Sequence, residues 1–551
     1  MTPGQVQPGP GLLPPGPGTE PELRGRQAGA AAALRLQRAR EVWPHISPRT
    51  RRLVLAAILL IAAGMRLWEI NAIGLNSDET VYAGQGASLA GTPELAPYFP
   101  TFRAHPLLFQ AILSIGFLLD GDEIFGRVAA AALGVATVYV TYLLGRLLYG
   151  ARAGLIAAAL LAVMPYHVVV TRQILLDGPR TLLSTLTLYL LARYALTERL
   201  TWFNAAAAAL GLSVLCKEDS VILLGAFYAF LALTPALRID IRNLICAAAI
   251  FILIVAAMTV ALDWAGRTGT GADYLAWQLF RRPNHSLLFY PAVVPVAVGA
   301  GVLAAAGAGM WLLRNDASWR ETLLLSWIAV PAAFFQLFPV KGFQYLLPIA
   351  PAVAVLAGRF FSHWDPRSVS PPTGALGLRS LPGARFIGPV ALGIVLVSLV
   401  ISSWQRVQPS NASTLLAGSG GLPRGRDAGR WIARHVPQGA QMMSIGPSMA
   451  NVLQYYGHRR VYGLSVSPNP LHRNPVYKAL HNPDRSIRDN ELQYIVWDAF
   501  SAARSPFFAR RMVRFVERYH GYVAHTETVT VRSPDGRPVQ KPVIVIFEVR
   551  P

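Results

Sequence analysis

The sequence predicts a polytopic α-helical membrane protein that carries a C-terminal extracytoplasmic α/β domain. The 551 residues are 53% hydrophobic and only 14% charged, whereas about 25% of the residues of a typical soluble domain are charged. Apolar runs of roughly 15 to 27 residues recur from Leu53 to Trp404, and about 20 apolar residues let a helix cross a bilayer. After Trp404 these long runs stop. The pattern excludes a soluble enzyme, a secreted disulfide scaffold and a transmembrane β-barrel.

The charge and the cysteines exclude two further kinds of protein. The net charge of +21 comes from 50 Lys and Arg against 29 Asp and Glu, spread over loops and tails. Membrane topology asks for basic residues on the cytoplasmic side, so we expect no nucleic-acid partner. Cys216 and Cys246 lie in or beside apolar runs. Neither disulfides nor a cysteine-rich metal site is therefore expected to hold the fold.

The membrane part is expected at residues 49–404. Residues 1–48 are rich in Pro, Gly, Ala and Arg and predict a disordered cytoplasmic tail. The basic cluster Arg49, Arg51 and Arg52 should keep the N-terminus in the cytoplasm. About eleven spans follow by apolar length, at residues 53–70, 128–148, 154–170, 181–196, 202–215, 221–233, 244–262, 287–313, 323–338, 346–361 and 387–404.

The apolar run at residues 106–119 decides the topology of the whole chain. With about 14 residues it is short for a crossing and typical of an interfacial helix, so we place it on the outer surface within a first outer loop at residues 71–127. The span at 128–148 then runs inward and delivers Arg146 and Arg152 to the cytoplasm, as the positive-inside rule prefers. If the run crossed the membrane, this basic turn would face outward.

Residues 405–551 are expected to form the α/β domain on the outer side of the membrane. Helical patterns alternate with short apolar runs, which is typical of a small α/β unit. We expect helices at 425–435, 448–456 and 506–520, an apolar run at 442–445, and strands at 494–498 and 543–549.

An adjacent acid pair, Asp78 and Glu79, lies a few residues beyond the first span. Two neighbouring carboxylates at a membrane surface can take a proton from an incoming hydroxyl or hold a divalent cation. A solvated pair of loop acids explains the same residues, and composition alone favours it.

Cationic side chains and a third acid come to the same side of the membrane. His105 opens the interfacial helix, Arg127 follows it, and Arg172 and Asp177 lie between two spans at their outer ends. An arginine fork at an outer interface suits a lipid-linked phosphate, although snorkelling to headgroups explains Arg127 and Arg172 equally well.

Two of the four lysines also occupy outer span ends. Lys217 could pair with Glu218 or Asp219, so a structural role is as plausible as a functional one. Lys341 is the better phosphate candidate because no acid lies beside it.

The order of these pieces resembles a known family. It consists of an acid pair after the first span, a His-Pro-opened interfacial helix, and then three motifs: EIFGR at 123–127, GRLLYG at 145–150 and RQILLDGP at 172–179. The chain thereby resembles GT-C glycosyltransferases of the protein O-mannosyltransferase and lipid A aminoarabinose transferase kind, closely over residues 53–233. Two departures stand out: His105-Pro106-Leu107 replaces the family's Pro-Pro-Leu, and Lys217-Glu218 replaces Lys-Gly.

The resemblance implies transfer of a sugar from a polyprenyl-phosphate carrier in the membrane lipid to an extracytoplasmic acceptor, which is a cell-envelope glycan, lipid or protein. It implies Asp78 as catalytic base with Glu79 beside it, Asp177 as the second-loop acid, and Arg127 as a contact to the carrier phosphate.

The mechanism that follows is a single displacement. Arg127, Arg172, Lys341 and His105 are the candidates to bind the departing phosphate, while Asp78 removes the acceptor's proton from the opposite face, which predicts inversion. A divalent ion on Asp78 and Asp177 is compatible with the sequence but not required by it. Two other classes stay open: a secondary transporter or lipid flippase, and a non-catalytic membrane scaffold.

Overall fold

The computed structural model describes residues 46–101, 105–119, 121–235, 237, 239–264, 277–278, 280–281, 283–363, 384–410, 422–469, 472–474, 477–532 and 535–551. The predicted disordered tail lies almost wholly outside the described residues. The chain divides into two units, Met1–Arg51 and Arg52–Pro551, and the contacts described below lie within the second.

Each predicted span coincides with a helix or with a broken pair of helices. The helices of this part are α2 (Pro48–Leu67), α5 (Glu123–Tyr149), α6 (Ala151–Ala162), α7 (Pro165–Val170), α8 (Asp177–Thr197), α9 (Leu200–Cys216), α10 (Ile222–Ala232), α11 (Ile241–Trp264), α13 (Phe289–Val294), α14 (Ala300–Leu312), α15 (Trp319–Leu337), α16 (Ala350–His363) and α17 (Ala384–Val407).

Two of the predicted spans are interrupted at prolines. The span predicted at 154–170 is divided into α6 and α7, and Pro165 occupies the first turn of α7, where its missing N–H costs nothing. The span predicted at 287–313 contains a π-helical turn, Pro295–Gly299, between α13 and α14. The length of the apolar runs in the sequence predicted the position of both segments, but it did not predict that the helices are interrupted.

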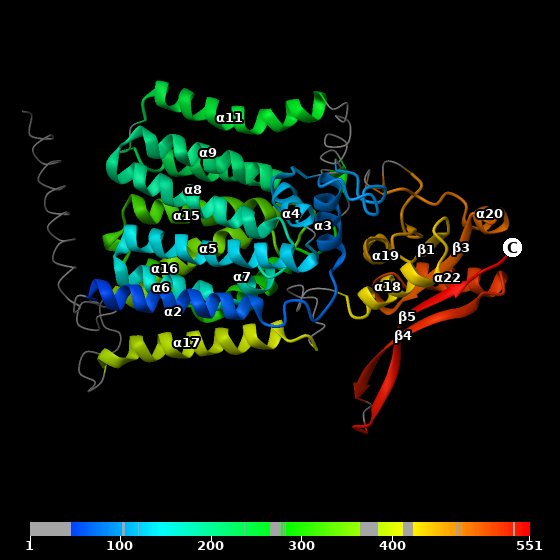
Figure 1. Ribbon diagram of the computed structural model, residues 1–551. Helices are drawn as coiled ribbons and strands as arrows, with labels where there is room; N and C mark the ends of the chain where they lie inside the picture. The colour runs from blue at the N-terminus through cyan, green and yellow to red at the C-terminus, as the bar shows by residue number, and fades with distance from the viewer. Residues whose placement is uncertain are drawn as a thin grey trace, which may run out of the picture. The chain divides into compact units, whose positions relative to one another are not determined.

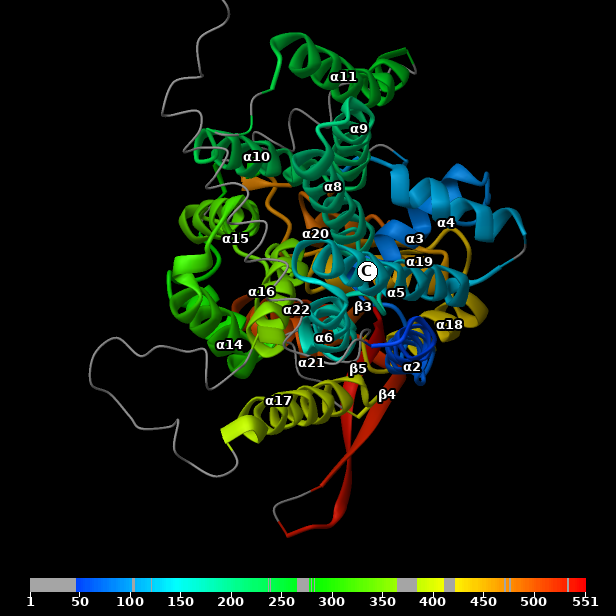
Figure 2. The same cartoon turned by 90° about the vertical axis from the view of Figure 1, so that its left-hand side faces the viewer.

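The helices differ in how much of their surface other helices cover. Four helical segments of the described residues are long and apolar enough to cross a membrane: Glu123–Tyr149, Ile241–Met258, Phe289–Leu312 and Phe386–Val407. More than half of α5 is buried, whereas α11 and α17 are mostly exposed, and both lie at the edge of the bundle (Figures 1 and 2). An apolar surface of this kind suits contact with lipid. The count of eleven spans stays a prediction.

Residues 71–127, named the first outer loop after their expected position, contain two short helices, α3 (Ser77–Leu89) and α4 (Leu108–Leu118). Both run across one end of the helix bundle and not along it (Figures 1 and 2). This orientation agrees with the expectation that the run at 106–119 does not cross the membrane.

The C-terminal residues form a five-stranded mixed sheet in the order β2-β1-β3-β5-β4. β1 pairs in parallel with β2 and β3, whereas β5 pairs antiparallel with β3 and β4. The elements are α18 (Gly425–His435), β1 (Gln441–Ser444), α19 (Pro447–Gly457), β2 (Arg460–Gly463), α20 (Pro483–Arg488), β3 (Leu492–Asp498), α21 (Ala499–Arg504), α22 (Pro506–Arg518), β4 (Tyr522–Arg532) and β5 (Pro538–Glu548).

Helices cover both faces of this sheet. Met442 packs in a cluster with α18 and α19, while its neighbour Met443 packs with α20 and α22, because successive side chains of a strand point to opposite faces. The α/β character was predicted, and α18 has the predicted bounds. Strands β2 and β4 and helices α20 and α21 were not predicted.

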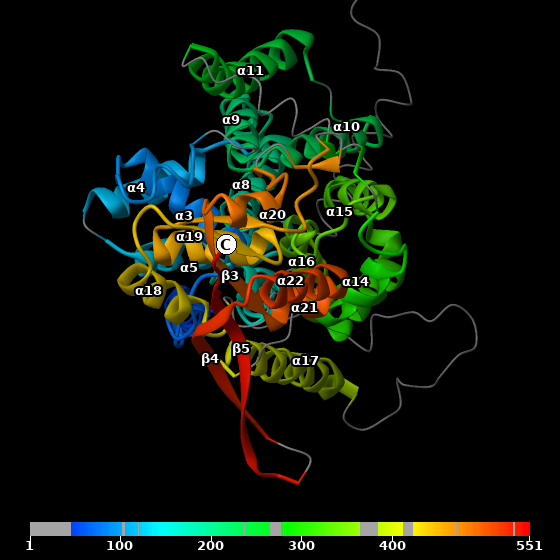
Figure 3. The same ribbon diagram turned by 90° about the vertical axis from the view of Figure 1, so that its right-hand side faces the viewer.

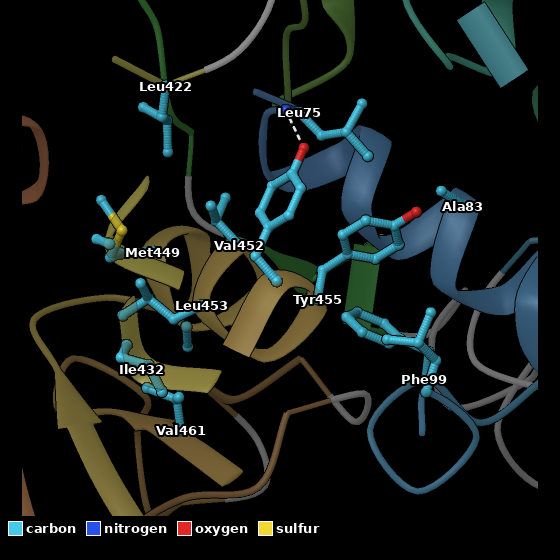
Figure 4. Packing of buried hydrophobic residues seen from close by; sticks show 14 of the residues in the cluster. Leu75, Ala83, Phe99, Leu422, Ile432, Met449, Val452, Leu453, Tyr455 and Val461 are labelled. Atoms are coloured by element: carbon cyan, nitrogen blue, oxygen red, sulfur yellow. Dashed lines mark hydrogen bonds between the residues drawn. The ribbon is translucent and has the colours of Figure 1, made fainter. Parts of the chain in front are cut away.

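One hydrophobic core joins the first outer loop to the C-terminal unit, which is the sheet with its helices from α18 to β5. Leu75, Ala83 and Phe99 of the loop pack with Val452 and Tyr455 of α19 (Figure 4), and α19 lies beside α3 (Figures 1 and 3). Polar contacts reinforce this core at its edges, since the Leu75 N–H donates to the Tyr456 hydroxyl at 2.8 Å and the Tyr98 hydroxyl donates to the His458 carbonyl at 2.8 Å. The loop and the C-terminal unit therefore fold as one body.

The close packing of α18 on α19 predicts the effect of one added methyl group. A Cβ atom at Gly429 would lie 2.3 Å from Cβ of Tyr456, and both atoms are fixed to backbone. The clash costs up to about 3 kcal/mol, more than the roughly 1 kcal/mol that alanine gains in a helix. We expect Gly429→Ala to lower the thermal unfolding midpoint in detergent. Gly439→Ala, where nothing lies within 4 Å, should leave it unchanged, and an unchanged midpoint for Gly429→Ala would contradict this packing.

Candidate active site

The first turn of α3 carries the acid pair, and Asn76 fixes where this helix begins. The Asn76 side chain accepts hydrogen bonds from the backbone N–H groups of Asp78 at 2.9 Å and Glu79 at 3.0 Å. In return, Glu79 Oε2 accepts the backbone N–H of Asn76 at 3.0 Å. This reciprocal capping box satisfies N–H groups that a helix start leaves unpaired. Asn76 Nδ2 also donates to Gln173 Oε1 at 2.8 Å, which ties α3 to the second outer loop.

Glu79 forms a buried ion pair with Arg127. The two side chains are 0% and 2% exposed, and the guanidinium donates from Nε and Nη2 to both carboxylate oxygens at 2.8 Å. Its other N–H groups donate to the carbonyls of Ile70, Ile73 and Gly74. All five N–H groups of Arg127 are thus used, and none is left for a phosphate. This geometry favours structural roles for Glu79 and Arg127 over the catalytic and phosphate-binding roles expected from the sequence.

The Arg172 side chain also donates its hydrogen bonds to backbone carbonyls. It donates to the carbonyl of Val407 at 3.0 Å and to that of Trp68 at 2.6 Å, and it is buried. The side chain therefore joins the segment after α2 to the end of α17. This arrangement differs from the phosphate contact that we expected of Arg172.

Asp177 lies at the start of α8 in a buried network of charges. Lys217 Nζ donates to its two carboxylate oxygens at 2.8 and 3.0 Å. Arg180 lies 3.5 Å from Asp177 and 3.1 Å from Asp219. Lys217 also stands 4.6 Å from the centre of the Tyr345 ring. Lys217 Nζ also lies 3.9 Å from Asp219 Oδ2, so one of the two neighbouring acids considered from the sequence does pair with it, beside the shorter contact to an acid 40 positions away along the chain.

Asp78 differs from its neighbour Glu79 because its side chain is exposed. Although this side chain reaches solvent, the protein packed around it removes part of the water from its carboxyl and raises its pKa; Lys217 and His105 oppose this rise, and the charges of Asp177 and Glu79 add to it. These four side chains therefore lie within electrostatic reach of Asp78. An accessible carboxylate with a raised pKa has the properties of a general base.

His105 lies at the same site, paired with Glu218. Its Nδ1 is 2.8 Å from Glu218 Oε2, so the two departures from the family pattern contact each other. Burial disfavours the charged ring, but the Glu218 carboxylate outweighs this effect and raises the pKa of His105. Glu218 accounts for the position of the His105 ring without a bound phosphate. Because the two residues lie far apart in the chain, their spacing in the sequence could not have indicated the contact.

Lys341, on the loop that carries Tyr345, is buried, and its Nζ donates to the carbonyl of Phe338 at 2.9 Å. Its backbone N–H and carbonyl both bond to the Asn284 side chain at 2.8 Å. Arg281 stacks on Trp277 with its guanidinium carbon 4.7 Å from the ring centre, and its charge acts on Tyr345. Arg281 belongs to none of the motifs found in the sequence. The one sequence feature that could have indicated a site residue here is the position of Arg281 between a spanning segment and an aromatic-rich turn.

Asp177 does not fit the divalent metal site considered from the sequence. Both oxygens of Asp177 are bound by the Lys217 ammonium, whose charge opposes a cation at the same carboxylate. Within the described ranges, no group of three or more His, Cys, Asp or Glu side chains has an arrangement suited to a metal ion.

Comparison with known sequences gives two related matches. The profile of the family described as dolichyl-phosphate-mannose-protein mannosyltransferase matches residues 104–263. The undecaprenyl phosphate-α-4-amino-4-deoxy-L-arabinose arabinosyl transferase 1 of Pseudomonas fluorescens is 30% identical over 339 residues, which cover 56% of this chain and 60% of that protein. The chain thus spans somewhat less than two thirds of this relative.

Comparison with solved structures adds the fold. ArnT from Cupriavidus metallidurans in the apo state matches with a TM-score of 0.65 and 15% identity, over 90% of this chain and 97% of that one. The resemblance to GT-C proteins of the ArnT and protein O-mannosyltransferase kind is confirmed. The same GT-C fold was also solved for ArnT bound to undecaprenyl phosphate, with a TM-score of 0.64. The oligosaccharyltransferase of Archaeoglobus fulgidus matches with a TM-score of 0.56 and 15% identity, over 90% of this chain and 74% of that one.

The different burial of the two first-loop acids predicts a large loss of stability when Glu79 is changed and almost none when Asp78 is changed. Glu79→Gln leaves the Arg127 guanidinium buried without its counter-charge, which costs about 3 to 5 kcal/mol. We therefore expect a large fall in the thermal midpoint, or loss of the folded protein. The adjacent change Asp78→Asn should leave the midpoint within a degree or two, because the side chain is exposed. Equal midpoints for the two variants would show that Glu79 has no special structural role.

Proposed function

We propose that this chain is a membrane glycosyltransferase that transfers a sugar from a polyprenyl-phosphate carrier to an acceptor on the outer face, with Asp78 as catalytic base. The observation that carries this proposal is the exposed Asp78 carboxylate beside Lys217, His105 and Asp177 on a GT-C fold. The similarity to ArnT, which binds undecaprenyl phosphate in a solved structure, supports the carrier class.

The two acids of the first loop take different roles in this proposal. Glu79 and Arg127 hold the start of α3 against α5 and the preceding loop, and this contact fixes the direction of the first turn. Asp78 is then the acid that meets the acceptor. Fixed placement of a base within hydrogen-bond distance of the reacting group is a large part of its catalytic effect.

The donor phosphate is proposed to bind at Lys341 and Arg281. Lys341 Nζ has three N–H groups, and Phe338 accepts one of them. Arg281 is partly exposed beside Tyr345. Cations at this position can neutralise charge on the phosphate oxygens as the bond to the sugar breaks.

The reaction follows as one displacement at the anomeric carbon. The acceptor gives its O–H or N–H proton to Asp78, its heteroatom forms the bond to the sugar, and the bond from the sugar to the phosphate oxygen breaks. The electron pair leaves with the polyprenyl phosphate. Since no covalent sugar intermediate forms, we expect inversion of configuration. Donor sugar and acceptor depend on pocket chemistry that the fold does not fix.

The proposed topology has the site outside and the N-terminus in the cytoplasm. Arg127 lies near the first turn of α5, and Arg146 lies in its last turn. A helix of 27 residues is about 40 Å long, so the two ends reach opposite sides of a bilayer. Basic residues at the far end favour the cytoplasm, which supports an extracytoplasmic position for the site and for the C-terminal unit.

Loss of the Asp78 carboxylate should abolish sugar transfer. In purified protein with a polyprenyl-phosphate sugar and membrane extract as acceptor source, we expect Asp78→Asn to lower the rate of carrier release by about 100-fold or more, as for removal of a general base. Glu94→Gln, at an exposed acid of the same loop, is the matched control and should keep wild-type turnover. Transport of the lipid that survives Asp78→Asn would favour the flippase alternative.

Removal of the Lys341 charge should weaken carrier binding. A hydrogen bond to a charged group contributes about 1.5 to 3 kcal/mol, so we expect Lys341→Gln to raise the Kd of undecaprenyl phosphate about tenfold to a hundredfold. Lys478→Gln, at an exposed lysine of the C-terminal unit, should leave the Kd unchanged. If the two variants bind the carrier equally well, the phosphate does not lie at Lys341.

A further inference from the structure

The contact between His105 and Glu218 joins two parts of the site that lie far apart in the chain. His105 precedes α4 in the first outer loop, and Glu218 opens a short 3-10 helix, Glu218–Val221, that follows α9. Nδ1 of the histidine is 2.8 Å and 3.1 Å from the two oxygens of the glutamate. The side chains are 16% and 25% exposed, so water screens this pair only in part. The contact holds the imidazole of His105 in one orientation.

The position of Tyr82 places this imidazole over the catalytic face of α3. Asp78 and Tyr82 are four residues apart, and side chains with this spacing lie on the same face of a helix. The rings of Tyr82 and His105 meet edge-on with centroids 6.0 Å apart. His105 therefore stands over the turn that presents Asp78, in line with the electrostatic effect of His105 on that carboxyl.

The charges around Asp78 are closely balanced. Lys217 and His105 favour its ionised form, whereas burial, Asp177 and Glu79 disfavour it. Lys217 is already engaged by Asp177 at 2.8 Å, so much of its charge is compensated. The imidazolium of His105 faces Glu218, Lys217 and Asp219 from the end of α9 and the 3-10 helix, and it is the second cation that acts on Asp78.

We propose that His105 and Glu218 are a positioning pair for the base: Glu218 holds a positively charged His105 beside Asp78, and this charge keeps Asp78 ionised until it takes the acceptor's proton. His105 itself neither gains nor loses a proton during the transfer. The inference rests on the proposed function, and it assigns to His105 an electrostatic role instead of the phosphate contact expected from the sequence.

The first test is the pH dependence of kcat/KM for carrier turnover. Below the pKa of Asp78 the base is protonated and the rate falls. Without the His105 charge that pKa rises further, so we expect His105→Asn to shift the acid limb upward by about 1 pH unit and Glu218→Gln to shift it in the same direction. His105→Lys, which stays charged over this range, should restore the wild-type acid limb. A purely structural role of His105 would lower the rate at all pH values without moving the limb.

The matched control is His520→Asn. His520 is exposed in the C-terminal unit and has a left-handed backbone with φ of 46°, which asparagine accepts readily. This variant should keep the wild-type acid limb. An acid limb in His105→Asn that coincides with the wild-type limb would overturn the proposal.

The second test needs no turnover and therefore separates failure of this inference from failure of the proposed function. Protein labelled with ¹³C at histidine Cε1 is titrated in nanodiscs, and the His105 signal is assigned by its absence in His105→Asn. We expect a titration midpoint above that of an ordinary histidine, a lower midpoint in Glu218→Gln and a lower midpoint in Asp78→Asn. If Glu218→Gln leaves the midpoint unchanged, the pair does not form, and if Asp78→Asn leaves it unchanged, His105 does not act on the base.

Discussion

The buried pair of Glu79 and Arg127 is the interaction on which the rest of the site depends. It joins the first turn of α3 to the first turns of α5, and the same guanidinium gathers three carbonyls of the loop at residues 70–74. A charge pair without access to water is stable only when its hydrogen bonds are complete, and here they are. The pair therefore fixes the direction in which α3 begins. This direction determines where the Asp78 side chain lies relative to Lys217, His105 and Asp177.

The end of the bundle that carries α3 then shows how one kind of residue serves two purposes. Glu79, Asp177 and Asp78 are all acids near the membrane surface, but the first two are buried and bound by cations, while the third is exposed. Buried side chains that are paired with cations fix the geometry of the site, whereas a side chain with access to solvent can react. This division explains why so many charges occur at a site that needs few of them for chemistry.

The positions of the helices could be predicted from the sequence because apolar length reports burial in lipid directly. The partners of the charged residues could not, because Asp177 meets Lys217 and His105 meets Glu218 only after the chain has folded. One signal was present and was not used: Asn76 followed three residues later by Glu79 is the spacing of a capping box, and it would have separated the structural acid from Asp78. Similarly, the alternation in Tyr522–Arg532 predicts strand β4, whereas the four residues of β2 are too few for such a pattern.

The core shared by the first outer loop and the C-terminal unit has a consequence for biosynthesis. The hydrogen bond from Leu75 to Tyr456 joins residues 381 positions apart, so the ribosome makes one partner long before the other. While the remaining helices are being inserted, Ala83 and Phe99 lack the surface that will cover them. The loop that presents Asp78 therefore reaches its final packing only after the ribosome has made α19, and a chain that stops before α19 cannot complete the proposed site.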